Sequence, residues 1–289
     1  MRVTNVIDFH VHVGSFERLR GDIQALLRQL KGKQDFDLEV LFSSPTGLYH
    51  YLQSEGVVNA VILAEEGPGT NFHITTEFVC DFRDEANTIS NDFFVAFGNI
   101  NPHRTPDISA AYRRDKARGI KGYKLYPADH NYHPISDSLM CFYKELERDG
   151  MILMFHTGTT SQEGGADQYG NPLLFRPILD ECPRLTVVFA HAGKPTFCRE
   201  AAFCARQYQN CYLDTAFISP SKLLTYLPDI ENYAEKVLFG SDWPAGVASL
   251  SGHIAALTEL GLRPQTLRRV FFENAAQLLG IAEKRAAAT

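Results

Sequence analysis

The first residues in the chain suited to chemistry are His10 and His12, in the segment Ile7-Asp8-Phe9-His10-Val11-His12. In an extended strand, side chains at positions i and i+2 leave the same face, so two imidazoles can converge on one point. A zinc-like ion takes nitrogen or oxygen donors at about 2 Å. The spacing therefore predicts two metal ligands on one strand, although two half-buried structural histidines would give the same pattern.

Three further polar residues close apolar runs that resemble buried strands. They are His156, His191 and Asp242, which follow 151–155, 185–190 and 237–241. A hydrophobic strand that stops at a single polar residue typically leaves the core and enters a cleft. Because separate strands repeat this pattern, we expect these side chains to meet the histidines of the first strand. A core histidine or a helix-capping aspartate is the alternative for each residue taken alone.

Strand-like and helix-like segments alternate along nearly the whole chain, which predicts a parallel sheet with crossover helices. About eight such units in 289 residues are typical of a single (β/α)₈ TIM barrel spanning 1–289. The expected strands are Thr4–Val13, Val58–Ala64, Phe93–Asn99, Ile120–Tyr126, Met151–His156, Thr186–His191, Cys211–Asp214 and Val237–Asp242. The expected helices are Thr75–Ser90, Pro106–Arg118, Asp137–Asp149, Thr196–Gln209, Pro220–Tyr233, Ser249–Leu260 and Thr266–Leu279.

The segment after the first strand is harder to interpret. Asp22–Leu30 has a helical pattern, but Lys31–Thr46 fits neither a helical nor a strand period and is predicted to be an inserted loop at 31–46. In a barrel of this kind the loops after the strands build the active site. The insertion is therefore a candidate lid or interface arm, with a plain surface excursion as the alternative.

Composition limits the classes of function. The formal net charge of -6 and a pI near 5.9 argue against nucleic-acid and anionic-membrane partners, and favour a small-molecule substrate. Six cysteines form no Cys-x-x-Cys pair, which predicts reduced thiols and a cytoplasmic location. No signal peptide is recognisable, and no apolar run reaches the roughly 20 residues needed to span a bilayer, so we expect a soluble protein.

Together these motifs resemble the amidohydrolase superfamily, in particular the branch that groups small metal-dependent hydrolases with non-oxidative decarboxylases. The resemblance spans nearly the whole chain and rests on the order and spacing of Asp8-x-His10-x-His12, His156, His191-Ala192-Gly193, Gly240-Ser241-Asp242-Trp243-Pro244 and Glu273-Asn274-Ala275-Ala276-x-Leu278-Leu279-Gly280. It implies that His10, His12, His156 and Asp242 surround one divalent metal ion, usually Zn²⁺ with Mn²⁺ as the alternative. It places His191 near the metal-bound water.

The resemblance also implies catalytic roles for Asp242 and His191. A metal ion lowers the pKa of its bound water from 15.7 towards about 7. Asp242 could accept that proton and pass it to a leaving group, while His191 could hydrogen-bond the water or a developing oxyanion.

Lys124 and Tyr126 end the fourth predicted strand with the same parity and are expected to face the barrel mouth. In some amidohydrolases a lysine here is carboxylated and bridges two metals, but we prefer a charged lysine that grips an anionic substrate group. The further substrate-contact candidates at the rim are His103, Arg104, His130 and Trp243. The arginine favours a substrate that carries a carboxylate.

The sequence therefore predicts a metal-dependent hydrolase that cleaves a small amide, lactone or ester bearing a carboxylate. The alternative is non-oxidative decarboxylation of an aromatic or unsaturated acid, since both chemistries share the fold and ligands. A third hypothesis is a non-catalytic ligand-binding barrel, which would be expected to lose one of the polar strand ends. A homodimer is expected only by analogy with similar barrels.

Overall fold

Eight strands form one parallel sheet in chain order in the computed structural model of the protein. The structure describes residues 5–31, 37–66, 73–90, 92–247 and 249–281. The strands are β1 Val6–His12, β2 Val57–Leu63, β3 Phe94–Gly98, β4 Gly122–Leu125, β5 Ile152–His156, β6 Thr186–Ala190, β7 Cys211–Asp214 and β8 Val237–Leu238. Each strand expected from the sequence is present: β7 has the predicted bounds, β2 is shifted by one residue, and the other six are shorter than predicted.

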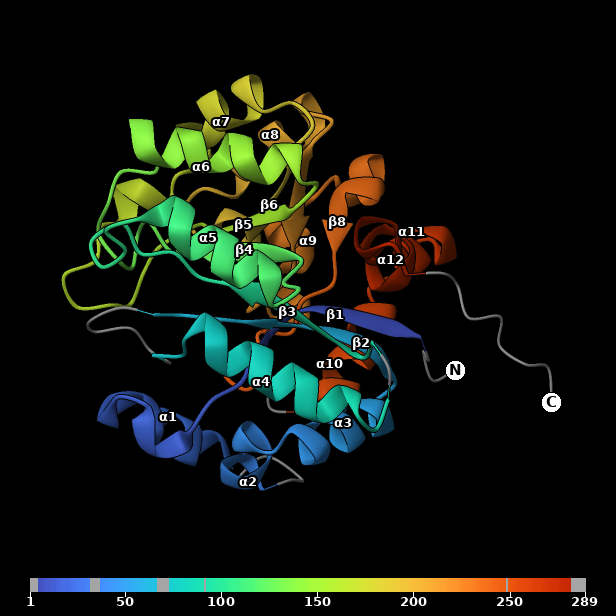
Figure 1. Cartoon of the computed structure of the whole chain (residues 1–289). Helices are drawn as coiled ribbons and strands as arrows, with labels where there is room; N and C mark the ends of the chain where they lie inside the picture. The colour runs from blue at the N-terminus through green and yellow to red at the C-terminus, as the bar shows by residue number, and fades with distance from the viewer. Residues whose placement is uncertain (1–4, 32–36, 67–72, 91, 248, 282–289) are drawn as a thin grey trace.

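The chain after β8 closes the sheet against β1. The amide of Phe9 donates to the carbonyl of Phe239 at 2.9 Å, and the amide of His12 donates to the carbonyl of Trp243 at 2.8 Å. The predicted strand Val237–Asp242 is thus regular only at its start, because Asp242 has a φ of +60° that no extended strand adopts. The result is the predicted (β/α)₈ barrel, with its helices outside the strands (Figure 1).

The helices follow the expected alternation along the chain. They are α1 Gly21–Lys31, α2 Leu38–Ser43, α3 Pro45–Ser54, α4 Thr76–Asn87, α5 Ile108–Ala117, α6 Asp137–Arg148, α7 Arg176–Glu181, α8 Cys198–Gln207, α9 Pro220–Tyr226, α10 Leu250–Thr258, α11 Pro264–Arg268 and α12 Asn274–Leu279. The predicted helix Pro220–Tyr233 ends early, because Pro228 disfavours the helical conformation at the residue before it. The predicted Thr266–Leu279 is interrupted by a π-helical turn at Arg269–Glu273.

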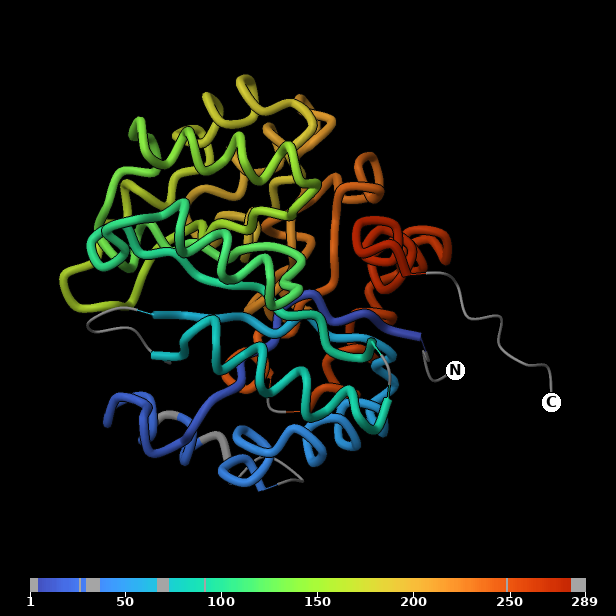
Figure 2. Tube along the Cα trace, in the orientation of Figure 1, coloured from blue at the N-terminus to red at the C-terminus, as the bar shows by residue number. Residues whose placement is uncertain are grey.

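The segment after β1 corrects the prediction of an inserted loop at 31–46. Leu38–Ser43 forms α2, and α3 starts at Pro45, while 32–36 lie outside the described residues. Leu38 and Phe42 are buried one helical turn apart, and the amide of Gly14 donates to the carbonyl of Phe42 at 2.9 Å. A six-residue helix is too short to show a clear period in sequence. In Figure 2 the chain runs from β1 out through α1 and α2 before α3 returns towards the sheet.

Apolar side chains fill the barrel below the strand ends. One buried cluster includes Phe9, Val61, Phe97, Met154 and Val188, and the rings of Phe9 and Phe97 meet edge to face at 5.8 Å. A larger cluster lies between the strands and the helices. Within the described residues all six cysteines are free, and only Cys141 is exposed, as expected for reduced thiols. Because this part of the interior is filled, we expect the site at the carboxyl ends of the strands, where barrels of this kind place it.

A register irregularity in β1 sets the direction of the two histidines. The pairing of β1 with β2 shifts between Asp8 and Val11. Phe9 lies in the interior cluster, and yet His10 and His12 line the cavity above it. Strict alternation would put Phe9 and His10 on opposite faces. The shift is therefore what turns His10 inward, in the way that β-bulges re-aim side chains near active sites.

The turn after β5 depends on a glycine. Gly158 has a φ of +99°, and a Cβ atom there would lie 1.9 Å from the carbonyl oxygen of Lys194. We expect Gly158→Ala to lower the free energy of unfolding by about 3 kcal/mol or more, measured by urea denaturation. Gly150→Ala is the matched control, because Gly150 also has a positive φ of +66° but nothing within 4 Å of the added methyl. In Gly150→Ala the free energy of unfolding should fall only by the cost of a left-handed alanine, about 1 kcal/mol. Equal decreases in the two variants would contradict the steric argument.

Candidate active site

A cavity of about 390 Å³ lies at the carboxyl ends of the strands. Residues at the ends of seven of the eight strands, or in the segments that follow them, contribute to its wall; β3 is the exception. The lining residues are His10, His12, Ile23, Glu65, Lys124, Tyr126, Asp129, His156, Thr157, Thr159, Thr160, Ser161, His191, Lys194, Phe217, Asp242 and Ala245. The predicted convergence of polar strand ends on one cleft is thus what the fold produces.

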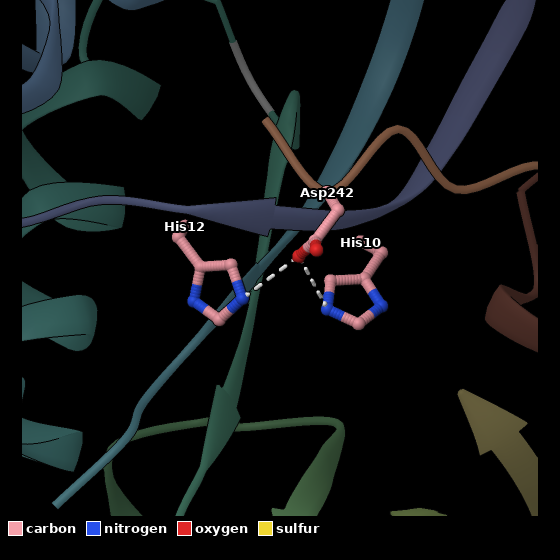
Figure 3. Close-up of side chains that lie close together, drawn as sticks. All are labelled: His10, His12 and Asp242. Carbon is pink, nitrogen blue, oxygen red and sulfur yellow. Dashed lines mark ion pairs between the residues drawn. The ribbon is translucent and has the colours of Figure 1, made fainter. Parts of the chain in front are cut away.

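Three predicted metal ligands meet inside this cavity. One carboxylate oxygen of Asp242, Oδ1, lies 3.1 Å from Nε2 of His10 and 3.1 Å from Nε2 of His12. Figure 3 shows the carboxylate between the two rings, with all three side chains pointing to one place. All three residues are buried, and their ligand atoms lie within 4.8 Å of one another. Two imidazole nitrogens and a carboxylate oxygen are donors that a catalytic zinc-like ion accepts.

The hydrogen bonds of His10 fit a cation at this point. Its Nδ1 lies 2.8 Å from Oδ2 of the buried Asp214, to which it donates. In the neutral ring, Nε2 then carries a lone pair that faces the carboxylate of Asp242. Two lone pairs approach this closely only when a proton or a metal ion lies between them. A carboxylate on the far nitrogen of a ligating histidine is also the usual support of a metal site.

The surroundings shift the pKa values of the three clustered residues in different directions. Burial and the nearby Lys124 act to lower the pKa of His10, but Asp214 and Asp242 outweigh them and raise it. Burial lowers the pKa of His12 to about 4, which keeps that ring neutral and able to ligate. Burial also acts to raise the pKa of Asp242, but His10 and His12 hold it well below its usual value. Asp242 is therefore an anion at neutral pH.

Asp214 is a site residue that the sequence analysis did not single out. Besides His10, its carboxylate accepts hydrogen bonds from the amides of His191 at 2.7 Å and Ala216 at 3.0 Å. It thus fixes the ring of one predicted ligand and the backbone of the predicted catalytic histidine. The signal was present, because the predicted strand Cys211–Asp214 also closes on a polar residue.

Replacing Asp214 tests this supporting role. Asp214→Asn removes the anion but keeps the shape, so the orientation of His10 is no longer fixed by charge. We expect metal affinity to fall by about 10- to 100-fold, measured by competition with a chromogenic chelator. Asp229→Asn, at an exposed aspartate, is the control and should bind metal as the unaltered protein does. Unchanged affinity in Asp214→Asn would contradict the role.

His191 follows β6 in a strained turn. His191, Ala192 and Gly193 have φ values of +63°, +45° and +74°. Nδ1 of His191 donates to the carbonyl of Ala216 at 3.1 Å, which leaves Nε2 as an acceptor. Burial holds the pKa of His191 well below its usual value, so the ring is neutral at pH 7. Left-handed residues of this kind persist mainly where the surroundings hold them for function.

His156 lines the cavity but stands apart from the three converging ligands. Its Nδ1 lies 3.5 Å from Oδ2 of Asp129, and its Nε2 lies 3.3 Å from the carbonyl of Thr159. Its ring is 4.8 Å from that of His191. Among the described residues, it belongs to neither group of side chains close enough to share an ion. The structure thus brings together three of the four predicted ligands.

Lys124 is fully buried beside the metal-binding group. Its Nζ lies 3.5 Å from Nε2 of His10 and 5.3 Å from the centre of the Tyr126 ring. Burial lowers the pKa of Lys124 to about 8, an effect limited by the carboxylates of Asp214 and Asp242. The hydroxyl of Tyr126 donates to the carbonyl of Ala64 at 3.1 Å. Both residues line the cavity, as their shared parity predicts.

The other predicted substrate contacts do not line the cavity. His103 and Arg104 are exposed, and Nε2 of His103 lies 3.2 Å from the carbonyl of Asn131. His130 is buried with its ring centre 5.3 Å from that of Tyr126. These residues lie on loops after β3 and β4, whose course the sequence pattern could not fix.

Trp243 likewise does not line the cavity. It is fully buried, with its ring centre 6.3 Å from that of Phe42 and 6.1 Å from that of Tyr51. Because its carbonyl pairs with the amide of His12, Trp243 continues the edge of the barrel and turns away from Asp242. It joins the barrel to α2 and α3.

The comparison with protein families assigns the chain. A family model described as amidohydrolase matches residues 7–281. The protein therefore belongs to the amidohydrolase family and is a metal-dependent enzyme of that family, as its motifs suggested. The comparison with curated proteins gives no match. The helices of the described residues include none with the length and hydropathy needed to cross a membrane.

Solved structures share the fold at low identity. An uncharacterized TIM-barrel protein from Bordetella bronchiseptica is 20% identical, with a TM-score of 0.76 over 96% of this chain and 99% of the other. A probable 2-pyrone-4,6-dicarboxylic acid hydrolase from Acinetobacter baumannii, with citric acid bound, is 14% identical, with a TM-score of 0.68 over 96% and 100%. A 5-carboxyvanillate decarboxylase from Sphingomonas paucimobilis is 16% identical, with a TM-score of 0.65 over 97% and 100%. At such identities the likeness concerns the fold.

Proposed function

We propose that the enzyme hydrolyses a small amide, lactone or ester that carries a carboxylate. The observation that carries this proposal is the position of Lys124, an ammonium buried beside His10, His12 and Asp242 with no carboxylate oxygen within 4.0 Å among the described residues. A lysine is seldom buried without a partner. A substrate anion is the partner that the cavity can admit.

The residues of the chain divide the work of such a reaction. His10, His12 and Asp242 would hold one divalent ion, and the mixed nitrogen and oxygen donors favour Zn²⁺, with Mn²⁺ as the alternative. When bound, that ion supplies a Lewis acid that polarises a carbonyl and acidifies water. Asp242 accepts a proton from the attacking water and returns it to the leaving nitrogen or oxygen. His191 is neutral and presents Nε2 to the cavity, where it can hold the water in line.

The lining of the cavity favours hydrolysis over decarboxylation of an aromatic acid. Of its residues only Ile23, Phe217 and Ala245 have wholly apolar side chains. A flat aromatic substrate needs an apolar slot against which its ring can pack. A small polar substrate is a better match for walls of histidine, threonine, lysine and carboxylate.

Decarboxylation is the second candidate, favoured by the likeness to a 5-carboxyvanillate decarboxylase. In that reaction Lys124 or an imidazole would deliver a proton to carbon before CO₂ leaves. The substrate carboxylate would then be the group that reacts, rather than a group that only binds to Lys124.

One screen separates the two reactions. The protein loaded with Zn²⁺ or Mn²⁺ is incubated with carboxylated lactones, carboxylated amides and hydroxybenzoates, and both CO₂ and newly formed acid or amine are measured. We expect acid or amine without CO₂. Release of CO₂ in proportion to substrate consumed would overturn the proposed hydrolysis.

Three features of the sequence analysis stay predictions: a cytoplasmic location, the absence of nucleic-acid or membrane partners, and a homodimer.

A further inference from the structure

A second lysine lines the same cavity and was not expected to belong to the site. Lys194 lies three residues after His191, and its backbone is fixed on both sides. Its amide donates to the carbonyl of His191 at 2.9 Å, and its carbonyl accepts from the amide of Thr159 at 3.3 Å. The backbone of Lys194 is thus tied to the turn that carries His191.

The ammonium of Lys194 is held at the rim. Its Nζ lies 4.2 Å from the centre of the Phe217 ring, a cation–π contact. Phe217 is 44% exposed, whereas Lys124 is fully buried at the bottom of the cavity. Lys194 itself is half-buried. The two ammonium groups therefore mark the outer and the inner end of one cavity.

The acidic residues of the wall have partners, whereas the two lysines have no acidic partner among the residues that the structure describes. Asp242 contacts His10 and His12, Asp129 contacts His156, and Glu65 also has an interaction partner. In the part of the chain that the structure describes, neither lysine ammonium has a carboxylate oxygen within 4.0 Å. A cation held half out of water beside an aromatic ring, facing a cavity, is suited to recognise an anion.

We propose that Lys194 forms a second anion-binding subsite at the rim, so that the substrate is a dianion with one anionic group towards Lys124 and another towards Lys194. This inference rests on the proposed function and narrows its substrate class. A chain or ring carrying two carboxylates is the simplest molecule of that class.

Binding of plain dicarboxylates tests the subsite without any reaction. The probes are the α,ω-dicarboxylates from succinate to adipate, each compared with its monomethyl ester, which removes one charge at nearly constant size. Dissociation constants are measured by isothermal titration calorimetry on the metal-loaded protein. For the diacid whose length matches the cavity, we expect affinity about tenfold above that of its ester, the value of one charge-assisted contact.

Variants test whether Lys194 causes this difference in affinity between the diacid and its ester, which is called the gap below. Lys194→Met should weaken the matching diacid about tenfold and leave its ester unchanged, while Lys194→Arg should keep most of the gap. Lys121→Met removes an exposed lysine at the opposite end of β4 and should behave as the unaltered protein. Circular dichroism checks that each variant is folded. We expect folding to be kept, because the side chain of Lys194 is only half-buried.

Two results would overturn the proposal: equal affinity of diacid and ester at every length, or an equal loss for both in Lys194→Met. Failure of the proposed hydrolysis would look different. It would change the products of turnover but leave the binding gap in place, because the gap reports charge recognition and not bond cleavage.

Discussion

Replacing Asp242 by asparagine is expected to lower kcat by about 10³-fold, the range for loss of a group that both moves a proton and holds charge in place. The carboxylate is the point shared by His10 and His12, each 3.1 Å away, and it is ionised at neutral pH. Asparagine has almost the same shape but cannot accept the proton. It also tolerates the left-handed φ of +60° at this position, so the backbone is kept. Turnover is measured at saturating metal, with metal content determined on the same sample.

Asp92→Asn is the matched control for this variant. Asp92 is also an aspartate with a positive φ, +62°, but it is exposed. It lies just before β3, whereas the cavity lies at the opposite, carboxyl ends of the strands. It should keep full activity and the same midpoint of thermal unfolding. If Asp242→Asn kept more than about a tenth of kcat, Asp242 would not be the proton acceptor.

Removing bound metal is expected to lower turnover by about 10³-fold or more, because a Lewis acid contributes several kcal/mol to the stabilisation of the transition state. The protein is treated with a chelator, dialysed and assayed, and then Zn²⁺ or Mn²⁺ is added back at one equivalent. Activity should return with at least one of the two ions. Bound metal should also raise the free energy of unfolding by about 4 kcal/mol at a concentration 1,000 times its Kd, since the unfolded chain lacks the site.

Histidine variants identify where that ion binds. His12→Gln should lose both the reactivation and the stabilisation by metal. His50→Gln, at an exposed histidine, should keep both. A chelated protein with full activity would contradict the metal-dependent mechanism, and metal stabilisation that persists in His12→Gln would place the ion elsewhere.

Parts of this architecture were predictable because local pattern carries them. Eight apolar runs gave the eight strands, and polar residues at their ends gave His10, His12, Lys124, His191 and Asp242 as neighbours in one cavity. Parallel strands of a barrel all open at one end, so residues at those ends meet however far apart they are in sequence.

Other parts were not predictable because they depend on loop geometry. His156 ends its strand as expected, but its ring contacts Asp129 and Thr159 and, among the described residues, is in neither group close enough to share an ion. Trp243 and Arg104 lie in segments that follow strand ends too, but neither lines the cavity. Lys194 enters it through a turn with three consecutive left-handed residues.

The sequence by itself determined the class of fold and the family, and it gave His10, His12 and Asp242 as candidate metal ligands, since periodicity and residue type act over a few neighbours. Only the tertiary structure decided that Asp214 orients His10, that β1 shifts register to turn His10 inward, and that Lys124 and Lys194 share a cavity. These features arise from contacts between residues up to about 200 positions apart, such as His10 and Asp214 with a separation of 204. The closure of the ring of strands decides which of these distant residues become neighbours, and no local pattern contains that information.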